Sequence, residues 1–188
     1  MNKFLLIALL TVMPVVTRSQ VSMHDVVRKM PTTQAPYLTE NNLLDLVDFK
    51  EAGMKAEVHN ALEGVSELLT LTDRYALLQL NAAHRMELLL LDVTEPVDSC
   101  QQLVCVVNTY GEDVRESIID FYSLSWRQLD ASRYVSSLPA GMFTATLDEQ
   151  SQQLVVTPSN YLDRPANEDQ QSVTYLPIYL KWINNIFK

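Results

Sequence analysis

The side chains that most often carry catalysis or bind metals are scattered along this chain. Its three histidines, His24, His59 and His84, lie 35 and 25 residues apart, without a His-x-His pair or a glutamate at metalloprotease spacing. The two cysteines lack the spacing of a zinc site. We therefore expect no metal site and no cofactor, and we expect His59 and His84 to lie at the surface.

Motifs for covalent catalysis and phosphate binding are also absent from the sequence. None of the four glycines belongs to a G-x-S-x-G elbow, a phosphate-binding loop or a dinucleotide fingerprint. Acidic pairs such as Glu112 and Asp113 fall in predicted turns, where water solvates both carboxylates. The sequence therefore predicts no catalytic residue, although a pair of distant carboxylates, as in glycosidases, would leave no local signature.

Two aromatic side chains are the candidates for a ligand-binding site. Tyr122 ends a predicted strand, and Trp126 lies in the connection after that strand. Aromatic side chains with polar tips can line a groove for a peptide, a glycan or a lipid. The alternative, which we favour, is that Phe121 packs in the core and Trp126 covers one end of the sheet.

The first nineteen residues are typical of a secretory signal peptide. A short positive start precedes an apolar run from Phe4 to Val16, and Thr17 and Ser19 are small residues at positions −3 and −1 of a cut before Gln20. An apolar run of about thirteen residues is too short to span a bilayer, which takes roughly 20. We therefore interpret this segment as an address that is removed and not as a membrane anchor.

The rest of the chain, residues 20–188, has the size of one domain. Because Lys3 and Arg18 lie in the signal peptide, this part has 12 basic and 23 acidic residues, a formal net charge of −11 with His neutral. Such acidity repels phosphate backbones and anionic lipid head groups. We therefore expect a soluble periplasmic or secreted protein, without a nucleic-acid partner and without a membrane anchor.

The two cysteines, Cys100 and Cys105, allow two interpretations. In an oxidising compartment they can form a disulfide, but on one continuous strand they would point to opposite faces, so a bridge requires residues 98–102 to turn. Alternatively, Cys105 is a small buried hydrophobe among leucine and valine neighbours.

Two helices are predicted at the start of the mature chain, followed by strands. Ser22 can cap the first helix, which ends at Pro31, and Thr39 can cap a second helix that Gly53 ends. From residue 54 onward, apolar and polar side chains alternate with the period of a strand, and the short connections join antiparallel neighbours. The expected strands are residues 54–60, 65–72, 75–81, 85–92, 102–109, 117–122, 142–147, 153–157 and 172–180. A long irregular, mobile loop is expected over residues 158–171.

One segment lacks this alternation. Residues 88–91 are four leucines, which predicts a central strand covered on both faces. The N-terminal helices would cover one face, and the curvature of the sheet or the C-terminal segment would cover the other. A helix over residues 84–92 is the competing interpretation.

The predicted fold class is α+β, with two N-terminal helices packed on a strongly curved antiparallel β-meander of about seven to nine strands. Sheets with that many strands tend to curl or split. A partly closed barrel is therefore expected.

Three phrases of the sequence are similar to a known family. They are residues 37–49 (YLTENNLLDLVDF), residues 53–58 (GMKAEV) and Leu71-Thr72-Asp73 with Tyr75. They resemble an uncharacterised family of exported proteins from Bacteroidales, a domain of unknown function, over nearly the whole mature chain. The resemblance implies a Gram-negative periplasmic or secreted setting. It implies no activity, since the family has no assigned catalytic residues.

Two classes of function remain. The first is a non-enzymatic binding or interaction protein, whose partner is a small apolar ligand enclosed by the curved sheet or another periplasmic protein. The second is a hydrolase acting on envelope or dietary glycans or peptides through residues without a local motif. The absence of catalytic motifs favours the binding protein.

We expect the mature protein to begin at or near Gln20 and to have no covalent lipid, because no cysteine stands near the predicted cleavage site. The intact mass of protein recovered from a cell-envelope fraction measures this. Retention of residues 1–19, or a mass increment the size of an acyl group, would contradict the prediction.

Overall fold

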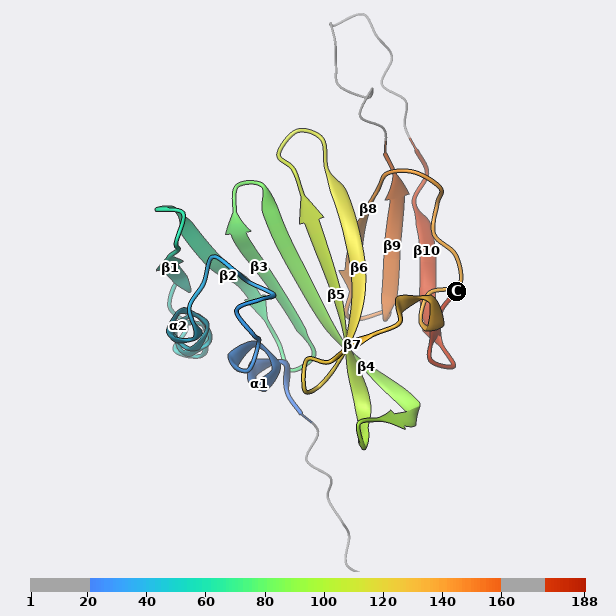
Figure 1. Ribbon diagram of the computed structural model, residues 1–188, viewed down its shortest axis with the longest axis horizontal. Helices are drawn as coiled ribbons and strands as arrows, with labels where there is room; N and C mark the ends of the chain where they lie inside the picture. The colour runs from blue at the N-terminus through green and yellow to red at the C-terminus, as the bar shows by residue number, and fades with distance from the viewer. Residues whose placement is uncertain (1–20, 160–174) are drawn as a thin grey trace, which may run out of the picture.

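The computed structural model describes residues 21–159 and 175–188, which form two helices, a short 3-10 helix and eleven strands (Figure 1). In chain order they are α1 (Met23–Arg28), α2 (Glu40–Glu51), β1 (Glu57–His59), β2 (Val65–Leu71), β3 (Tyr75–Asn81), β4 (His84–Val97), β5 (Cys100–Tyr110), β6 (Glu116–Ser123), β7 (Gln128–Leu129), η1 (Ala131–Arg133), β8 (Phe143–Asp148), β9 (Gln153–Pro158), β10 (Ile178–Ile183) and β11 (Ile186–Phe187). Strands β1 to β7 form a seven-stranded antiparallel meander, here the large sheet, and β8 to β11 form the small sheet, in the order β11-β10-β9-β8.

Both predicted helices are confirmed, with the predicted caps. The Ser22 side chain accepts a hydrogen bond from the Asp25 backbone, and Thr39 forms a reciprocal capping box with Asn42. Gly53 comes after the second helix with φ +70°, a conformation that glycine adopts without a steric penalty. None of the described helices is long and apolar enough to cross a membrane.

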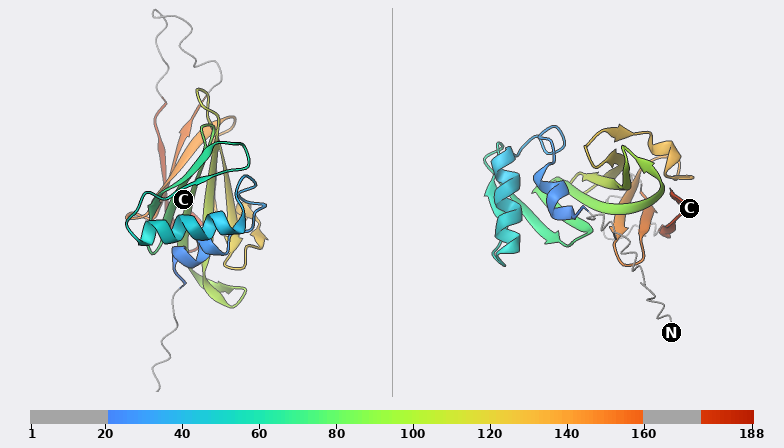
Figure 2. Two further views of the ribbon diagram at one scale, coloured as in Figure 1. Left: turned by 90° about the vertical axis from the view of Figure 1, so that its left-hand side faces the viewer. Right: turned by 90° about the horizontal axis from the view of Figure 1, so that it is seen from below.

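The two helices cover one face of the large sheet, here called the helix face (Figure 2, left). Buried side chains of α1 and α2, such as Val27 and Leu46, pack in one cluster with Leu88 and Leu90 of β4. The helices are joined to each other at the surface, where Arg28 donates to Asp48 and to Glu51 at 2.8 Å.

The small sheet covers the other face, here called the barrel face. Leu89 and Leu91 of β4 pack there with side chains of β5, β6 and the small sheet, among them Leu147, Leu154 and Phe187. Leu88 to Leu91 are all fully buried. The predicted central strand with two covered faces is therefore confirmed, and the alternative of a helix over residues 84–92 is wrong.

The two sheets are connected at both seams, so that the strands curl into a partly closed barrel (Figure 2, right). At one seam, the chain after η1 pairs with β11: the Phe187 N–H donates to Tyr134 O at 2.8 Å, and the Ser136 N–H donates to Phe187 O at 3.0 Å. At the other seam, β8 lies across β4, β5 and β6 without strand pairing to them. The predicted α+β class with a strongly curved antiparallel sheet is confirmed.

Side chains replace strand pairing at the seam of β8. The Ala145 N–H donates to the Ser117 hydroxyl at 2.8 Å, and the Leu147 N–H donates to the Glu87 carboxylate at 2.9 Å. Glu87 is 2% exposed and also accepts from the Tyr75 hydroxyl at 2.9 Å. Arg85 forms an ion pair with Glu87 at 3.0 Å. Burial and the Glu87 charge raise the pKa of Tyr75, so its hydroxyl keeps its proton and donates.

The structure differs from the sequence-based prediction in the details of the strands. It has more strands than the seven to nine expected, because the two-residue strands β7 and β11 carry too few side chains for a period to be seen. The hairpin of β4 and β5 continues to a tip at residues 98–99, beyond the expected ends at residues 92 and 102. Pro177 directly precedes β10. Most of the loop expected over residues 158–171 lies outside the described residues, as does the start of the last expected strand, residues 172–174.

The disulfide interpretation is wrong, since Cys100 and Cys105 are free and lie on one continuous strand, β5. Cys105 points into the barrel and is fully buried, as the alternative interpretation held. Burial raises the pKa of its thiol, so this cysteine is an inert packing group.

We expect Glu87→Ala to lower the free energy of unfolding by about 2–4 kcal/mol, because two buried donors, the Leu147 N–H and the Tyr75 hydroxyl, would lose their acceptor. Glu87→Gln should cost less, since its amide oxygen can still accept. Urea denaturation of the mature protein measures both, with Glu112→Ala on the exposed β5–β6 turn as the control. Equal midpoints for Glu87→Ala and the control would contradict this role for Glu87.

Candidate functional site

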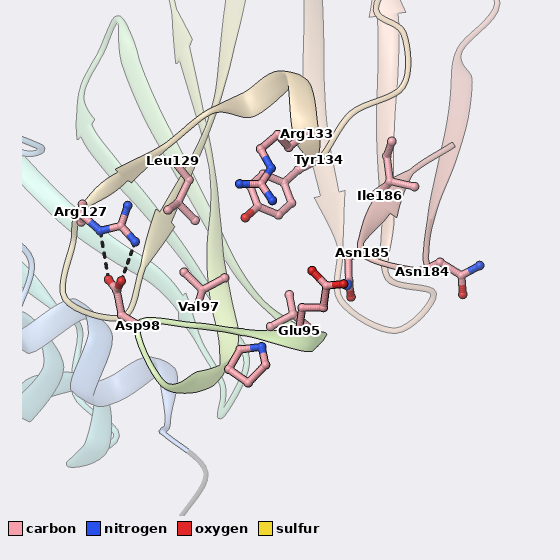
Figure 3. A pocket seen from close by; sticks show the side chains of 12 residues that line it. Glu95, Val97, Asp98, Arg127, Leu129, Arg133, Tyr134, Asn184, Asn185 and Ile186 are labelled. Atoms are coloured by element: carbon pink, nitrogen blue, oxygen red, sulfur yellow. Dashed lines mark hydrogen bonds and ion pairs between the residues drawn. The ribbon is translucent and has the colours of Figure 1, made fainter.

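Four chain segments meet at one end of the barrel and form a groove of about 480 Å³ (Figure 3). They are the β4–β5 hairpin at residues 93–98, the start of β7 at residues 127–129, the end of η1 at residues 133–134 and the β10–β11 turn at residues 184–186. The volume is in the range of small-molecule sites in proteins. It is the candidate functional site.

Two tight turns shape this groove. Asp98 and Ser99 have φ values of 49° and 66°, and Asn184 and Asn185 have φ values of 53° and 64°. Turns with two consecutive left-handed residues match the twist of a hairpin, and Asn and Asp tolerate this conformation better than most residues. The two short turns therefore fix the backbone conformation at two walls of the groove.

The β10–β11 turn is hydrogen-bonded to β4 at the end of the groove away from Asp98 and Arg127. The Asn185 side chain donates to the Thr94 hydroxyl at 2.7 Å and accepts from the Thr94 N–H at 3.0 Å. The indole N–H of Trp182 donates to Asp92 O at 2.8 Å. These bonds join residues about 90 positions apart in the sequence and hold two walls of the groove together.

An aromatic cluster lies beneath the groove. The Tyr134 ring is 5.0 Å from Phe121 and 6.3 Å from Trp182, between ring centroids, and Trp182 is 5.0 Å from Phe187. All four rings belong to the barrel core or pack against it. Of these rings Tyr134 lines the groove, and the other three pack behind it in the barrel.

Charged side chains line the two ends of the groove. At one end the Arg127 guanidinium donates to both Asp98 oxygens, at 2.5 and 3.2 Å (Figure 3). This hydrogen bonding lowers the pKa of Asp98 to about 2. At the other end Glu95 points toward Asn185, and Arg133 lies beside Tyr134. Neither Glu95 nor Arg133 forms an ion pair with another described residue.

The groove has two carboxylates. Glu95 and Asp98 lie at opposite ends of it in Figure 3. A glycosidase pairs a carboxylic acid that keeps its proton with an ionised carboxylate, and Asp98, which Arg127 holds ionised, has the charge of the second group and not of the first. Among residues 21–159 and 175–188, no three His, Cys, Asp or Glu side chains are grouped to hold a metal ion.

The two predicted ligand-binding residues, Tyr122 and Trp126, lie together in the helix-face core. Their ring centroids are 5.4 Å apart, and the two residues are 5% and 9% exposed. The Trp126 indole N–H donates to Val26 O at 3.3 Å and so attaches α1 to the sheet. Neither residue lines the groove. A ligand-binding role for them stays a prediction.

The histidines are not brought together by the fold. His24 bonds to Glu51 at 2.7 Å on the helix surface, and His59 is exposed on β1 as expected. The expectation of a surface position is wrong for His84, which is 4% exposed and stacks on the Tyr110 ring at 4.4 Å. Burial lowers the pKa of His84, so its ring is neutral and packs as an aromatic group.

Sequence patterns contain only part of the signal for this groove. The pairs Asp98-Ser99 and Asn184-Asn185 are turn-forming residues between apolar segments, which can be recognised as hairpin tips. Nothing local indicates that these two tips lie beside residues 127–134. That proximity comes from the pairing of the sheets.

Comparisons with known proteins give a family and a fold. A model of a family described as "Protein of unknown function (DUF3256)" matches residues 15–174. The chain is also similar to a solved structure described as "Structure of a domain of an uncharacterized protein from Porphyromonas gingivalis W83", with a TM-score of 0.71 and 18% sequence identity, covering 88% of this chain and 96% of that chain. No curated protein matches the chain significantly. The resemblance to a Bacteroidales family of unknown function is supported by these matches, which carry no information about export.

We expect Asn185→Gly to lower the free energy of unfolding by about 1–2 kcal/mol, because it removes two hydrogen bonds to Thr94 while glycine keeps the left-handed turn. Asn184→Gly is the matched control, since the Asn184 side chain points away from the protein (Figure 3). Thermal unfolding of the two variants measures the difference. If both variants unfold at the same temperature, the Asn185 side chain does not hold the groove walls together.

Proposed function

Since the chain belongs to the DUF3256 family, described as proteins of unknown function, we propose that it is an exported, non-enzymatic binding protein whose ligand occupies the groove beside the β4–β5 hairpin. The observation that carries the proposal is the convergence there of four chain segments, with Tyr134 of the barrel core in the groove wall. Function in α+β folds is commonly carried by such loops on a rigid scaffold.

The ligand that fits this lining is polar and carries a carboxylate. Arg133 has a guanidinium without an ion-pair partner among the described residues, and a guanidinium can bind a carboxylate with two parallel hydrogen bonds. Glu95, which lies across the groove from Arg133 in Figure 3, can accept a hydrogen bond from an amine or an amide of the same ligand. Tyr134 and Ile186 add apolar contact. A short peptide with a free carboxyl terminus has all of these groups.

An apolar ligand inside the curved sheet receives less support. The barrel interior is packed with side chains that are at most 9% exposed, including Leu91, Val107 and Phe121. A lipid-like ligand would have to displace them, and disrupting a close-packed core costs several kcal/mol. The groove at the end of the barrel requires no such displacement.

Export rests on residues 1–19, whose charge and apolar run are those of a signal peptide. After cleavage the protein would reside in the periplasm or the secreted fraction. An acidic protein in that setting resists association with anionic envelope surfaces, which agrees with a diffusible binding protein.

The test is calorimetric titration of the mature protein with a panel of di- and tripeptides, each in a free-carboxyl form and a carboxyl-terminal amide form. We expect saturable binding of free-carboxyl peptides, at least tenfold weaker binding of their amides, and at least tenfold weaker binding to Arg133→Gln. Lys29→Gln, which removes an exposed positive charge at the end of α1, is the control and should bind as the wild type does.

Two outcomes would overturn the proposal. Binding of free-carboxyl peptides that is unaffected by Arg133→Gln, or no binding across the panel, would remove the groove as a peptide site. Cleavage of the peptides, seen by mass spectrometry of the titration mixtures, would favour the hydrolase.

A further inference from the structure

A second, smaller pocket of about 160 Å³ lies at the opposite end of the barrel. It is formed where the β3–β4 turn and the β5–β6 turn lie side by side, joined by a hydrogen bond of 2.8 Å from the Gly111 N–H to Ala83 O. In Figure 1 both turns are at the top of the large sheet, and the β4–β5 hairpin that lines the groove is at the bottom. The pocket is therefore separate from the groove, and a ligand bound in it would be independent of the proposed function.

A row of polar side chains crosses the barrel face at this end. Gln79 pairs with Arg85, Arg85 pairs with Thr109, and Thr109 pairs with Ser117 on four neighbouring strands. Residues that pair directly in antiparallel strands point to the same face, and this is the face of Leu89. The apolar core of the barrel therefore ends in polar groups here.

The row is held in place by its own hydrogen bonds. The Gln79 amide donates to Asn81 O at 2.6 Å, which ties it to the β3–β4 turn. The hydroxyls of Thr109 and Ser117 are 2.8 Å apart, and Ser117 accepts from β8. The pocket wall is preorganised, so a ligand would not have to order it.

The charged residues described at this pocket are both positive. Among residues 21–159 and 175–188, Arg85 and Arg115 line it and no carboxylate does, in a chain with a net charge of −9. Arg85 is held from behind by Glu87 at 3.0 Å, and Arg115 is held by a hydrogen bond of 3.2 Å from its Nε to Glu112 O. The Nε of Arg85 is buried and has no partner among the described residues.

We propose that this pocket binds a small oxyanion, a phosphate or carboxylate group, between the guanidinium groups of Arg85 and Arg115. Planar guanidinium groups bind such oxyanions with paired hydrogen bonds. Water takes about 30 Å³ per molecule, so the volume holds roughly five waters or one such anion with its remaining hydration. Because Glu87 balances the charge of Arg85, Arg115 supplies the net positive charge and binding is weak, in the millimolar range.

The test is titration of the mature protein with inorganic phosphate, acetate and glycerol phosphate, followed by the amide chemical shifts of Thr109 and Gly111 at constant ionic strength in sodium chloride. We expect saturable shifts at these two residues and at least tenfold weaker binding to Arg115→Gln. Lys29→Gln, which removes an exposed positive charge at the end of α1, is the matched control and should leave the binding unchanged. Comparison of inorganic phosphate with glycerol phosphate distinguishes free phosphate from a phosphate monoester.

Arg85→Lys gives a second, independent test. It keeps a positive charge beside Glu87 but lacks the planar fork of arginine, so we expect several-fold weaker binding with an unchanged denaturation midpoint. Shifts that chloride reproduces, shifts that do not saturate, or equal losses in Arg115→Gln and Lys29→Gln would each overturn the proposal. If Arg115→Gln fails to fold, the wild-type shifts and the Arg85→Lys variant decide it.

Discussion

A strand edge that is buried must find partners for its backbone N–H groups, and in this protein the edge of β8 finds them in side chains. Glu87 and Ser117 of the large sheet accept hydrogen bonds from Leu147 and Ala145. A carboxylate oxygen can accept more than one hydrogen bond, so Oε2 of Glu87 serves both β8 and Tyr75, while Oε1 forms the ion pair with Arg85. These contacts hold the edge of the small sheet against the large sheet.

Closure at this seam, together with the pairing of β11 to residues 134–136, fills the space between the two sheets. The interior is occupied by packed side chains, and the two pockets described for residues 21–159 and 175–188 lie at the ends of the barrel. One end has the groove with mixed charges and Tyr134 in its wall, and the other has the small pocket with two arginines. The groove and the small pocket each lie beside hairpin turns. The strands of the barrel separate the two.

The composition of the two ends changes the kind of ligand that fits this protein. The many strands and the run of leucines in the sequence suggested a carrier of apolar molecules, but those leucines fill the two cores. The groups that remain accessible at the barrel ends are guanidinium, carboxylate and amide groups. These polar groups support our proposal of a polar ligand.

The sequence by itself determined the local elements of this protein. Hydrogen bonds within four residues define the helix caps at Ser22 and Thr39, and an alternation of period two defines the strands. A strand with four consecutive leucines is apolar on both faces, so both faces must be covered. The burial of Cys105 is likewise explained by its apolar neighbours. Only the tertiary structure decided that Glu87 is buried beneath β8, that Tyr122 and Trp126 lie under α1, and that residues 93–98 meet residues 184–186. These contacts join segments that are tens of residues apart in the sequence. They form only when the two sheets pack together, and neither a local period nor a helix cap indicates which sheets will pack.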